Sequence, residues 1–127
     1  MNVDIKKVAM AYFEAVESRS HEAIMDLFDE KCGVFFANFG VSYGRQAFEE
    51  VNKQLVQQFK QLFFKKEEFI FTVQDYRVVV EGVEYGKLAN GQIIKDNRMC
   101  NVFEINPVTG LITRMYAYTD PNLGLKE

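Results

Sequence analysis

The chain has 127 residues and a mass of 14.7 kDa, and 48% of its residues are hydrophobic, including 12 Phe and 6 Tyr. This is the size of one compact domain with enough apolar material for a core, so we predict a single domain over residues 1–127. The net charge is −3 and basic residues form no cluster, which argues against nucleic acid or an anionic membrane surface as a partner.

The first residues lack the charged head and apolar stretch of a secretory signal, and no apolar run reaches the length that spans a bilayer. We therefore expect a soluble, cytoplasmic protein. Cys32 and Cys100 are isolated thiols without the spacing of metal ligands. Neither a disulfide, a metal site nor a cofactor is predicted, and both thiols are expected to be small buried side chains.

Helical periodicity dominates the first half of the chain. The spacing of apolar residues predicts helices over about residues 3–18, from Ser20 to about Asp29, and from Arg45 to about Phe64. Ser20 is a plausible N-cap of the second helix. Between the second and third helices, the aromatic-rich segment 33–40 is bounded by glycines and favours a buried strand.

The second half changes to the alternation of strands. Strands are predicted over about residues 69–74, 78–89, 92–105 and 111–118, with bends at Gly82 and Gly86. Asn90 and Gly91 indicate a hairpin with a type I′ turn, and the segment 106–110 indicates a second turn.

Three helices followed by a meander of long strands define an α+β fold, in which the N-terminal helices pack on a strongly curved antiparallel sheet. Such a cone-shaped α+β barrel has an interior. Because helices close only one end, an apolar concavity is expected there, lined by Phe, Tyr and Met side chains.

Two stretches, residues 11–28 and 96–116, resemble the nuclear transport factor 2-like superfamily in its SnoaL-like and ketosteroid-isomerase-like branch. The resemblance extends over about residues 5–121 and implies a cystatin-like cone in a single SnoaL-like domain. Proteins of this kind include isomerases, aldol-type cyclases, epoxide hydrolases, dehydratases and non-catalytic binders, so the resemblance specifies the fold better than the reaction.

In the isomerase pattern, a tyrosine on the first helix and an acid on a late strand donate hydrogen bonds to an oxyanion, while a carboxylate at the end of the first strand moves the proton. The resemblance places the tyrosine at Tyr12, the late acid at Asn101 and the base at Phe36. Two donors are therefore kept and the base is missing. An epoxide-hydrolase-like site also loses support, because its inward carboxylate falls on Ala117.

Strand alternation extends these assignments. If Asn101 faces the concavity, so do Met99 and Phe103, and the outward set is Arg98, Cys100, Val102 and Glu104. If Ala117 faces inward, the inward set also includes Thr113 and Met115, and Tyr116 and Tyr118 face out. Apolar residues on the outer face should be covered. The homodimer that the resemblance implies, packed through the outer sheet face, fits this expectation.

We predict a pocket for a small hydrophobic or aromatic, carbonyl-bearing molecule, with Tyr12 and Asn101 holding its polar end. The expected lining is Tyr12, Val16, Phe36, Phe59, Met99, Asn101, Phe103, Met115 and Ala117. One alternative is an isomerase, lyase or polyketide-cyclase-like enzyme that stabilises an oxyanion and has its base elsewhere. Another is a non-catalytic dimerisation module with a filled cone.

Several residues also have ordinary interpretations. Tyr12 could equally be a core tyrosine. Glu84 is expected to be a solvated strand residue, although its place between two glycines could turn it inward. His21 is disfavoured as a catalytic group, and Asp96 and Arg98 are expected to form exposed ion pairs.

Overall fold

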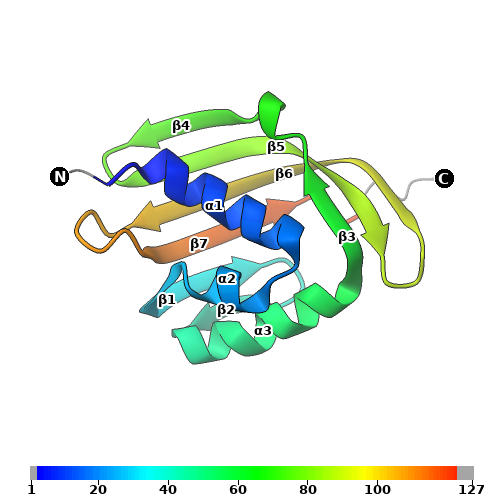
Figure 1. Ribbon diagram of the computed structural model, residues 1–127, viewed down its shortest axis with the longest axis horizontal. Coiled ribbons are helices and arrows are strands. Elements are labelled where there is room, and N and C mark those ends of the chain that lie inside the picture. Colours follow the sequence, from blue (N-terminus) through cyan, green and yellow to red (C-terminus); the bar gives the residue numbers. More distant parts are fainter. Residues whose placement is uncertain (1–2, 123–127) are drawn as a thin grey trace.

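The computed structural model describes residues 3–122, in which three helices pack against one strongly curved seven-stranded sheet (Figure 1). The helices are α1 (Ile5–Ser18), α2 (His21–Met25) and α3 (Arg45–Gln58), and a single 3-10 turn, η1, spans Lys66–Glu68. The strands are β1 (Phe28–Phe36), β2 (Gly40–Tyr43), β3 (Phe59–Phe64), β4 (Ile70–Gln74), β5 (Arg77–Leu88), β6 (Ile93–Ile105) and β7 (Ile112–Thr119). Both ends of the predicted domain 1–127, residues 1–2 and 123–127, lie outside the described residues.

The strand order is β2-β1-β7-β6-β5-β3, and β4 also pairs with β5. Strand β5 thus holds two partners along one edge, β4 opposite residues 77–81 and β3 opposite residues 84–88. The sheet is mixed and not purely antiparallel as predicted, because the first long strand, β1, lies parallel to the last, β7. The α+β class and the curved sheet of the prediction are confirmed.

Helix α1 begins where Asp4 caps it, with the Asp4 carboxylate accepting from the Lys7 amide at 3.3 Å. It ends at Arg19, which adopts the left-handed conformation with φ of 60°. The helix lies across the concave side of the sheet (Figure 1), and its buried residues are Ile5, Ala9, Tyr12, Phe13 and Ala15. Phe13, fully buried at its centre, packs 4.8 Å from Phe64 and 5.8 Å from Phe103 between ring centroids, so removing this ring would cost about 3–5 kcal/mol.

The prediction that the third helix continues to Phe64 is wrong, because α3 ends at Gln58 and the next six residues form β3. The guanidinium of Arg19 donates to the carbonyl oxygens of Val56, at 3.1 Å, and of Phe59. These bonds occupy acceptors at the C-terminal end of the helix. The aromatic segment that follows satisfies its backbone on β5 instead.

The remaining elements follow the prediction with smaller corrections. Ser20 caps α2 by accepting from the Ala23 amide at 3.1 Å. The β5–β6 hairpin forms at the expected place, but of its turn residues only Gly91 has a positive φ, 94°. The Leu88 amide donates to the Gln92 carbonyl at 2.9 Å, and the Gly91 amide donates to the Leu88 carbonyl at 2.9 Å. The first bond encloses three residues, the arrangement of a three-residue loop and not of a type I′ turn.

The alternation predicted for β6 is confirmed, because Met99, Asn101 and Phe103 are buried on the concave side; Asn97, which was not predicted, is buried there too. On β7, Ile112 replaces Thr113 in the core because a register shift interrupts the pairing with β6. The outer face carries the expected aromatic residues. Phe35 lies 5.4 Å from Tyr116 and 5.3 Å from Tyr118 between centroids.

Candidate functional site

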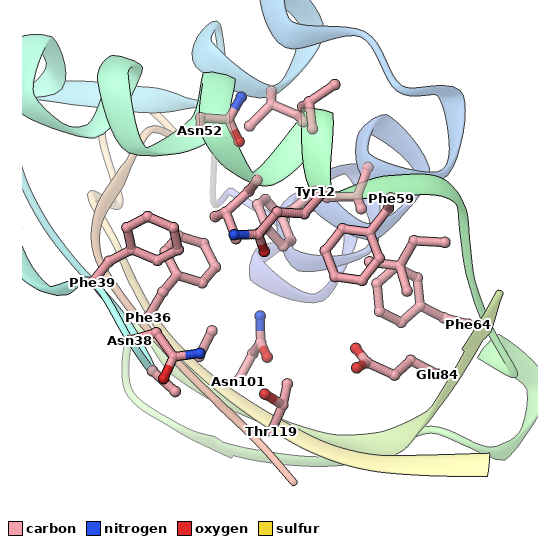
Figure 2. Close-up of a pocket in the computed structure, with 18 of the residues that line it drawn as sticks. Tyr12, Phe36, Asn38, Phe39, Asn52, Phe59, Phe64, Glu84, Asn101 and Thr119 are labelled. Atoms are coloured by element: carbon pink, nitrogen blue, oxygen red, sulfur yellow. The ribbon is translucent and has the colours of Figure 1, made fainter. Parts of the chain in front are cut away.

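A cavity of about 150 Å³ lies between helices α1 and α3 and the concave face of the sheet (Figure 2). Its walls are mostly apolar, and four phenylalanine rings contribute to them: Phe36, Phe39, Phe59 and Phe64. A space of this volume accommodates a single benzene-sized ring. A concavity is therefore present on the concave side of the sheet, and that it is a ligand pocket stays a prediction.

Most of the residues predicted to line a pocket reach this cavity, namely Tyr12, Val16, Phe36, Phe59, Asn101 and Ala117. Met99, Phe103 and Met115 face the same side of the sheet but are buried in the core. That part of the cone is filled, because the Phe103 ring packs 5.6 Å from Tyr12 and 5.8 Å from Phe13 between centroids. That any of these residues binds a ligand stays a prediction.

Glu84 lines the cavity and is 5% exposed, so the expectation of a solvated strand residue is wrong. It lies on β5 directly opposite Asn97 of β6, and Asn97 Nδ2 donates to Glu84 Oε2 at 2.8 Å. Burial raises the pKa of the Glu84 carboxyl to about 7, and the hydrogen bond from Asn97 opposes this rise. A carboxyl group that exchanges its proton near neutral pH thus faces an apolar cavity.

Tyr12 and Asn101 supply hydrogen-bond donors to the same space (Figure 2). Burial, and after it the charge of Glu84, raises the pKa of the Tyr12 phenol above its ordinary value, so the hydroxyl keeps its proton. Among residues 3–122, the one hydrogen-bond partner of Asn101 Nδ2 is the sulfur of Met115, at 3.8 Å. Because a thioether is a weak acceptor, this amide remains available to a ligand.

Asn52 is a further polar residue of the cavity, and it was not singled out from the sequence. It is 3% exposed, lies on α3, and its Nδ2 is 2.8 Å from His21 Nδ1 on α2. Its position four residues after the buried Phe48 is the one signal that indicates it faces inward.

The buried polar side chains of residues 3–122 gather at this cavity. They are Asn52, Glu84, Asn97 and Asn101. Three of them line the cavity, and Asn97, which does not, donates a hydrogen bond to the carboxylate of Glu84. Because burying polar groups opposes folding unless they are paired, their concentration at one cavity indicates a binding or catalytic site.

Within the described residues, no group of three or more His, Cys, Asp or Glu side chains is arranged to hold a metal ion. Across residues 3–122, every helix is too short or too polar to cross a bilayer. A cytoplasmic location stays a prediction. Asp96 is exposed as expected, but its ion-pair partner is Lys65, at 2.7 Å, and not Arg98.

No protein-family model matches this sequence, and no curated protein matches it. Solved structures do match. A proposed polyketide cyclase from Xanthomonas campestris pv. campestris is 21% identical, with a TM-score of 0.77 over 91% of this chain and 90% of that chain. An NTF2-like protein from Anabaena variabilis is 17% identical, with a TM-score of 0.77 over 91% of this chain and 85% of that chain. TerC, co-crystallised with polyporic acid, is 16% identical, with a TM-score of 0.72 over 91% of each chain.

At these identities the likeness defines the fold. The chain has the NTF2-like fold, in the form shared by SnoaL-like polyketide cyclases, as the sequence resemblance implied.

Proposed function

We propose that this protein is an enzyme that moves a proton on a small apolar molecule carrying a carbonyl group, as an isomerase, lyase or cyclase does. The observation that carries the proposal is Glu84, a buried carboxyl group that lines the cavity and has a pKa of about 7. Near that pH the carboxylate and the acid are both populated, so one residue can accept a proton and return it.

The three polar groups suit an enolisation. The Glu84 carboxylate takes a proton from a carbon next to the ligand's carbonyl, and the electron pair of the broken C–H bond moves onto the carbonyl oxygen. The Tyr12 hydroxyl and the Asn101 amide donate hydrogen bonds to that oxygen, where charge develops. In a ligand with a carbon–carbon double bond one carbon beyond the deprotonated one, the enolate is a conjugated dienolate, and protonated Glu84 then gives the proton to its far carbon, which completes an isomerisation.

The structural neighbours support this class of chemistry without defining the substrate. One is a proposed polyketide cyclase, and another, TerC, was co-crystallised with polyporic acid. The apolar walls support a hydrophobic ligand, and the cavity volume of about 150 Å³ supports one of single-ring size.

Deuterium uptake by acetophenone tests the proposal. We expect the protein to catalyse exchange of the methyl hydrogens in D₂O, followed by NMR, with a rate that rises with pH through about 7 and then levels off. Glu84→Gln should reduce the rate to that of buffer. Glu81→Gln is the matched control, because Glu81 lies on the same strand and is exposed. Exchange by Glu84→Gln at the rate of the unmodified protein would refute the assignment.

A second candidate function is ligand binding without turnover. It is favoured by Phe36, whose apolar ring occupies the place that the resemblance assigns to the isomerase base, and which packs 6.2 Å from Phe48 between centroids. This candidate predicts that acetophenone stabilises the protein against thermal unfolding while no deuterium enters the ligand.

We also propose that two copies associate through the outer sheet face. The cluster of Phe35, Tyr116 and Tyr118 lies on that face, and Tyr118 is 48% exposed. An apolar surface of this kind favours a covering partner. Sedimentation equilibrium measures the association directly, and a monomer at all concentrations would contradict it.

A further inference from the structure

Asn52 forms a second polar wall of the cavity. Figure 2 shows it on α3, away from Glu84 and on the other side of the space, with its amide oxygen on the cavity side. Its amide nitrogen is already engaged, because Nδ2 lies 2.8 Å from His21 Nδ1. The oxygen is therefore the atom of Asn52 that a ligand can reach.

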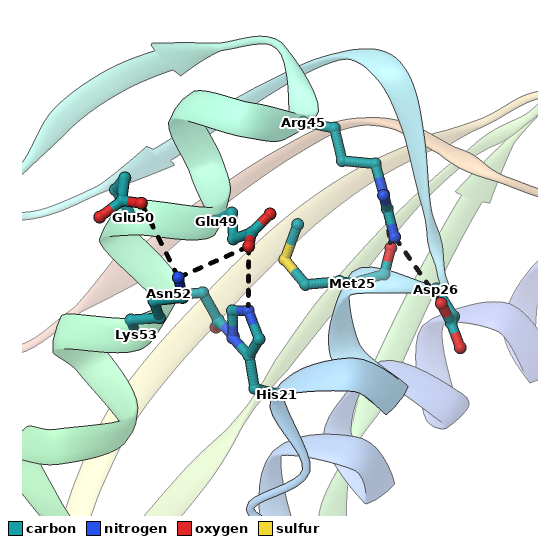
Figure 3. A network of polar contacts seen from close by, with 8 residues as sticks. All are labelled: His21, Met25, Asp26, Arg45, Glu49, Glu50, Asn52 and Lys53. Carbon is teal, nitrogen blue, oxygen red and sulfur yellow. Dashed lines mark hydrogen bonds and ion pairs between the residues drawn. The ribbon is translucent and has the colours of Figure 1, made fainter.

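The orientation of this amide is set from outside the cavity (Figure 3). Glu49 Oε1 lies 4.0 Å from His21 Nε2 and also pairs with Lys53, at 3.6 Å. At this distance Glu49 makes no hydrogen bond, and Nε2 is buried without a hydrogen-bond partner among the described residues, but the negative charge of Glu49 favours the imidazole tautomer that carries its proton on Nε2. The lone pair of His21 then lies on Nδ1, where only an N–H donor makes a hydrogen bond.

This tautomer leaves Asn52 one orientation. Its Nδ2 must face His21, because an oxygen placed there would meet a second lone pair, and its Oδ1 must face the cavity. Among the described residues, the side chain of Asn52 makes one hydrogen bond, and its partner is His21. No hydrogen bond within residues 3–122 is made to Asn52 Oδ1, so a ligand that supplies a donor can form one there.

We infer that Asn52 Oδ1 accepts a hydrogen bond from a hydroxyl group of the ligand, and that His21, oriented by Glu49, fixes the amide for this purpose. Asn52 is thus a specificity-determining residue and His21 a positioning residue. The inference rests on the proposed function, since it places the ligand's carbonyl near Tyr12, Asn101 and Glu84. The substrate class becomes a single-ring carbonyl compound with a hydroxyl group across the ring.

Three ring-sized ketones of matched shape test this inference by binding. Acetophenone lacks a second polar group, para-hydroxyacetophenone adds a donor, and para-acetylpyridine adds an acceptor. Titrations followed by NMR should show para-hydroxyacetophenone binding about tenfold more tightly than acetophenone, as one buried neutral hydrogen bond provides. The acceptor compound should bind more weakly than acetophenone, because its ring nitrogen faces the Asn52 oxygen.

Variants separate recognition from structural support. Asn52→Leu should bring the affinity ratio of the hydroxylated compound to acetophenone close to one. Asn52→Asp, which keeps an acceptor oxygen, should preserve the preference for the hydroxyl. His21→Leu should let the amide turn, so that the affinity for para-acetylpyridine rises relative to para-hydroxyacetophenone. A purely structural role for His21 would not change this ratio.

The control is Gln54→Leu, because Gln54 lies on the same helix as Asn52 but is exposed and outside the cavity lining. It should leave the preference for para-hydroxyacetophenone in place. If Asn52→Leu does not fold, as judged by thermal unfolding, the affinity ratio measured with His21→Leu tests the inference.

The outcomes distinguish the two proposals. If acetophenone binds and exchanges deuterium but the hydroxylated compound binds no more tightly, the inference about Asn52 fails and the proposed function stands. An unchanged ratio in Asn52→Leu also overturns the inference. If none of the three ketones binds the unmodified protein, both the inference and the carbonyl-ligand function are overturned.

Discussion

Replacing Glu84 by glutamine should stabilise the protein at alkaline pH. Burial raises the pKa of this carboxyl from its ordinary value of 4.5 to about 7, which means that the folded state disfavours the charged form. Glutamine has nearly the same shape, stays neutral at all pH values, and its side-chain oxygen can still accept the hydrogen bond from Asn97. The substitution therefore removes the buried charge and little else.

The magnitude and its sign follow from the two pKa values. A rise from 4.5 to about 7 corresponds to about 3 kcal/mol of free energy of unfolding. Because the folded pKa is the higher one, the stability that Glu84 contributes is fully present below about pH 4.5 and is lost as the pH rises through about 7. We therefore expect the free energy of unfolding of Glu84→Gln to be higher than that of the unmodified protein by about 3 kcal/mol near pH 8, and by little near pH 5.

Urea unfolding of both proteins between about pH 5 and pH 8.5 measures this difference. Asp96 and Glu104 have lowered pKa values because of neighbouring Lys65 and Arg77, but they are common to both proteins and cancel in the difference. A stability difference that is independent of pH, or that grows toward acid, would refute the assignment of a buried carboxyl with a raised pKa.

Three further substitutions make separate predictions. Tyr12→Phe should slow deuterium exchange about 100-fold, the effect of losing one oxyanion donor, while changing the free energy of unfolding by less than about 1 kcal/mol; an unchanged rate would remove Tyr12 from the site. Asn97→Leu should shift the pH profile of exchange to higher pH, because the hydrogen bond that lowers the pKa of Glu84 is lost. It should change the free energy of unfolding in urea little, because Asn97 Oδ1 is buried without a partner among the described residues. A shift of the profile to lower pH would contradict this prediction. Tyr118→Arg should convert the proposed dimer to monomer in sedimentation experiments, whereas Tyr76→Arg, at a tyrosine of similar exposure (46% against 48%), should not.

The sequence contained the signal for Glu84, although the favoured interpretation missed it. Val78 and Val80 are fully buried on β5, and alternation carried four residues past Val80 puts Glu84 on the same face. Our prediction names the flanking glycines, and not the alternation, as the feature that could turn Glu84 inward, and it favours a solvated side chain. In the structure the register shift on β5 comes only between Glu84 and Gly86, so the alternation holds up to Glu84.

The burial of Asn97, which pairs with Glu84 on β6, could have been predicted by the same reasoning. Asn97 has the parity of Asn101, and the alternation that correctly placed Met99 and Asn101 on the concave side places Asn97 there too. Two buried polar residues on neighbouring strands then predict a contact. Strand periodicity thus determined most of the polar lining on the sheet side of the cavity.

The helical side of the cavity could not be predicted in this way. The contact between His21 and Asn52 joins residues 31 positions apart on two different helices, and its existence depends on how α2 packs against α3. The end of α3 depends likewise on Arg19, whose guanidinium bonds to carbonyl groups 37 and 40 positions away. Neither contact can be predicted from local helix propensity, and the predicted third helix therefore included the residues that form β3.

The cavity lowers the stability of the folded protein in two ways, and this destabilisation is an argument that the cavity has a function. An empty space removes packing contacts from an apolar core, and the carboxyl of Glu84 loses its water and gains one hydrogen bond in return. Leucine at positions 52 and 101 would remove two of these polar groups, and glutamine at position 84 would remove the buried charge, in each case with a side chain of similar volume. A protein that used this cone only as a scaffold would gain stability from such residues, and selection for binding or proton transfer explains why the polar side chains stand there instead.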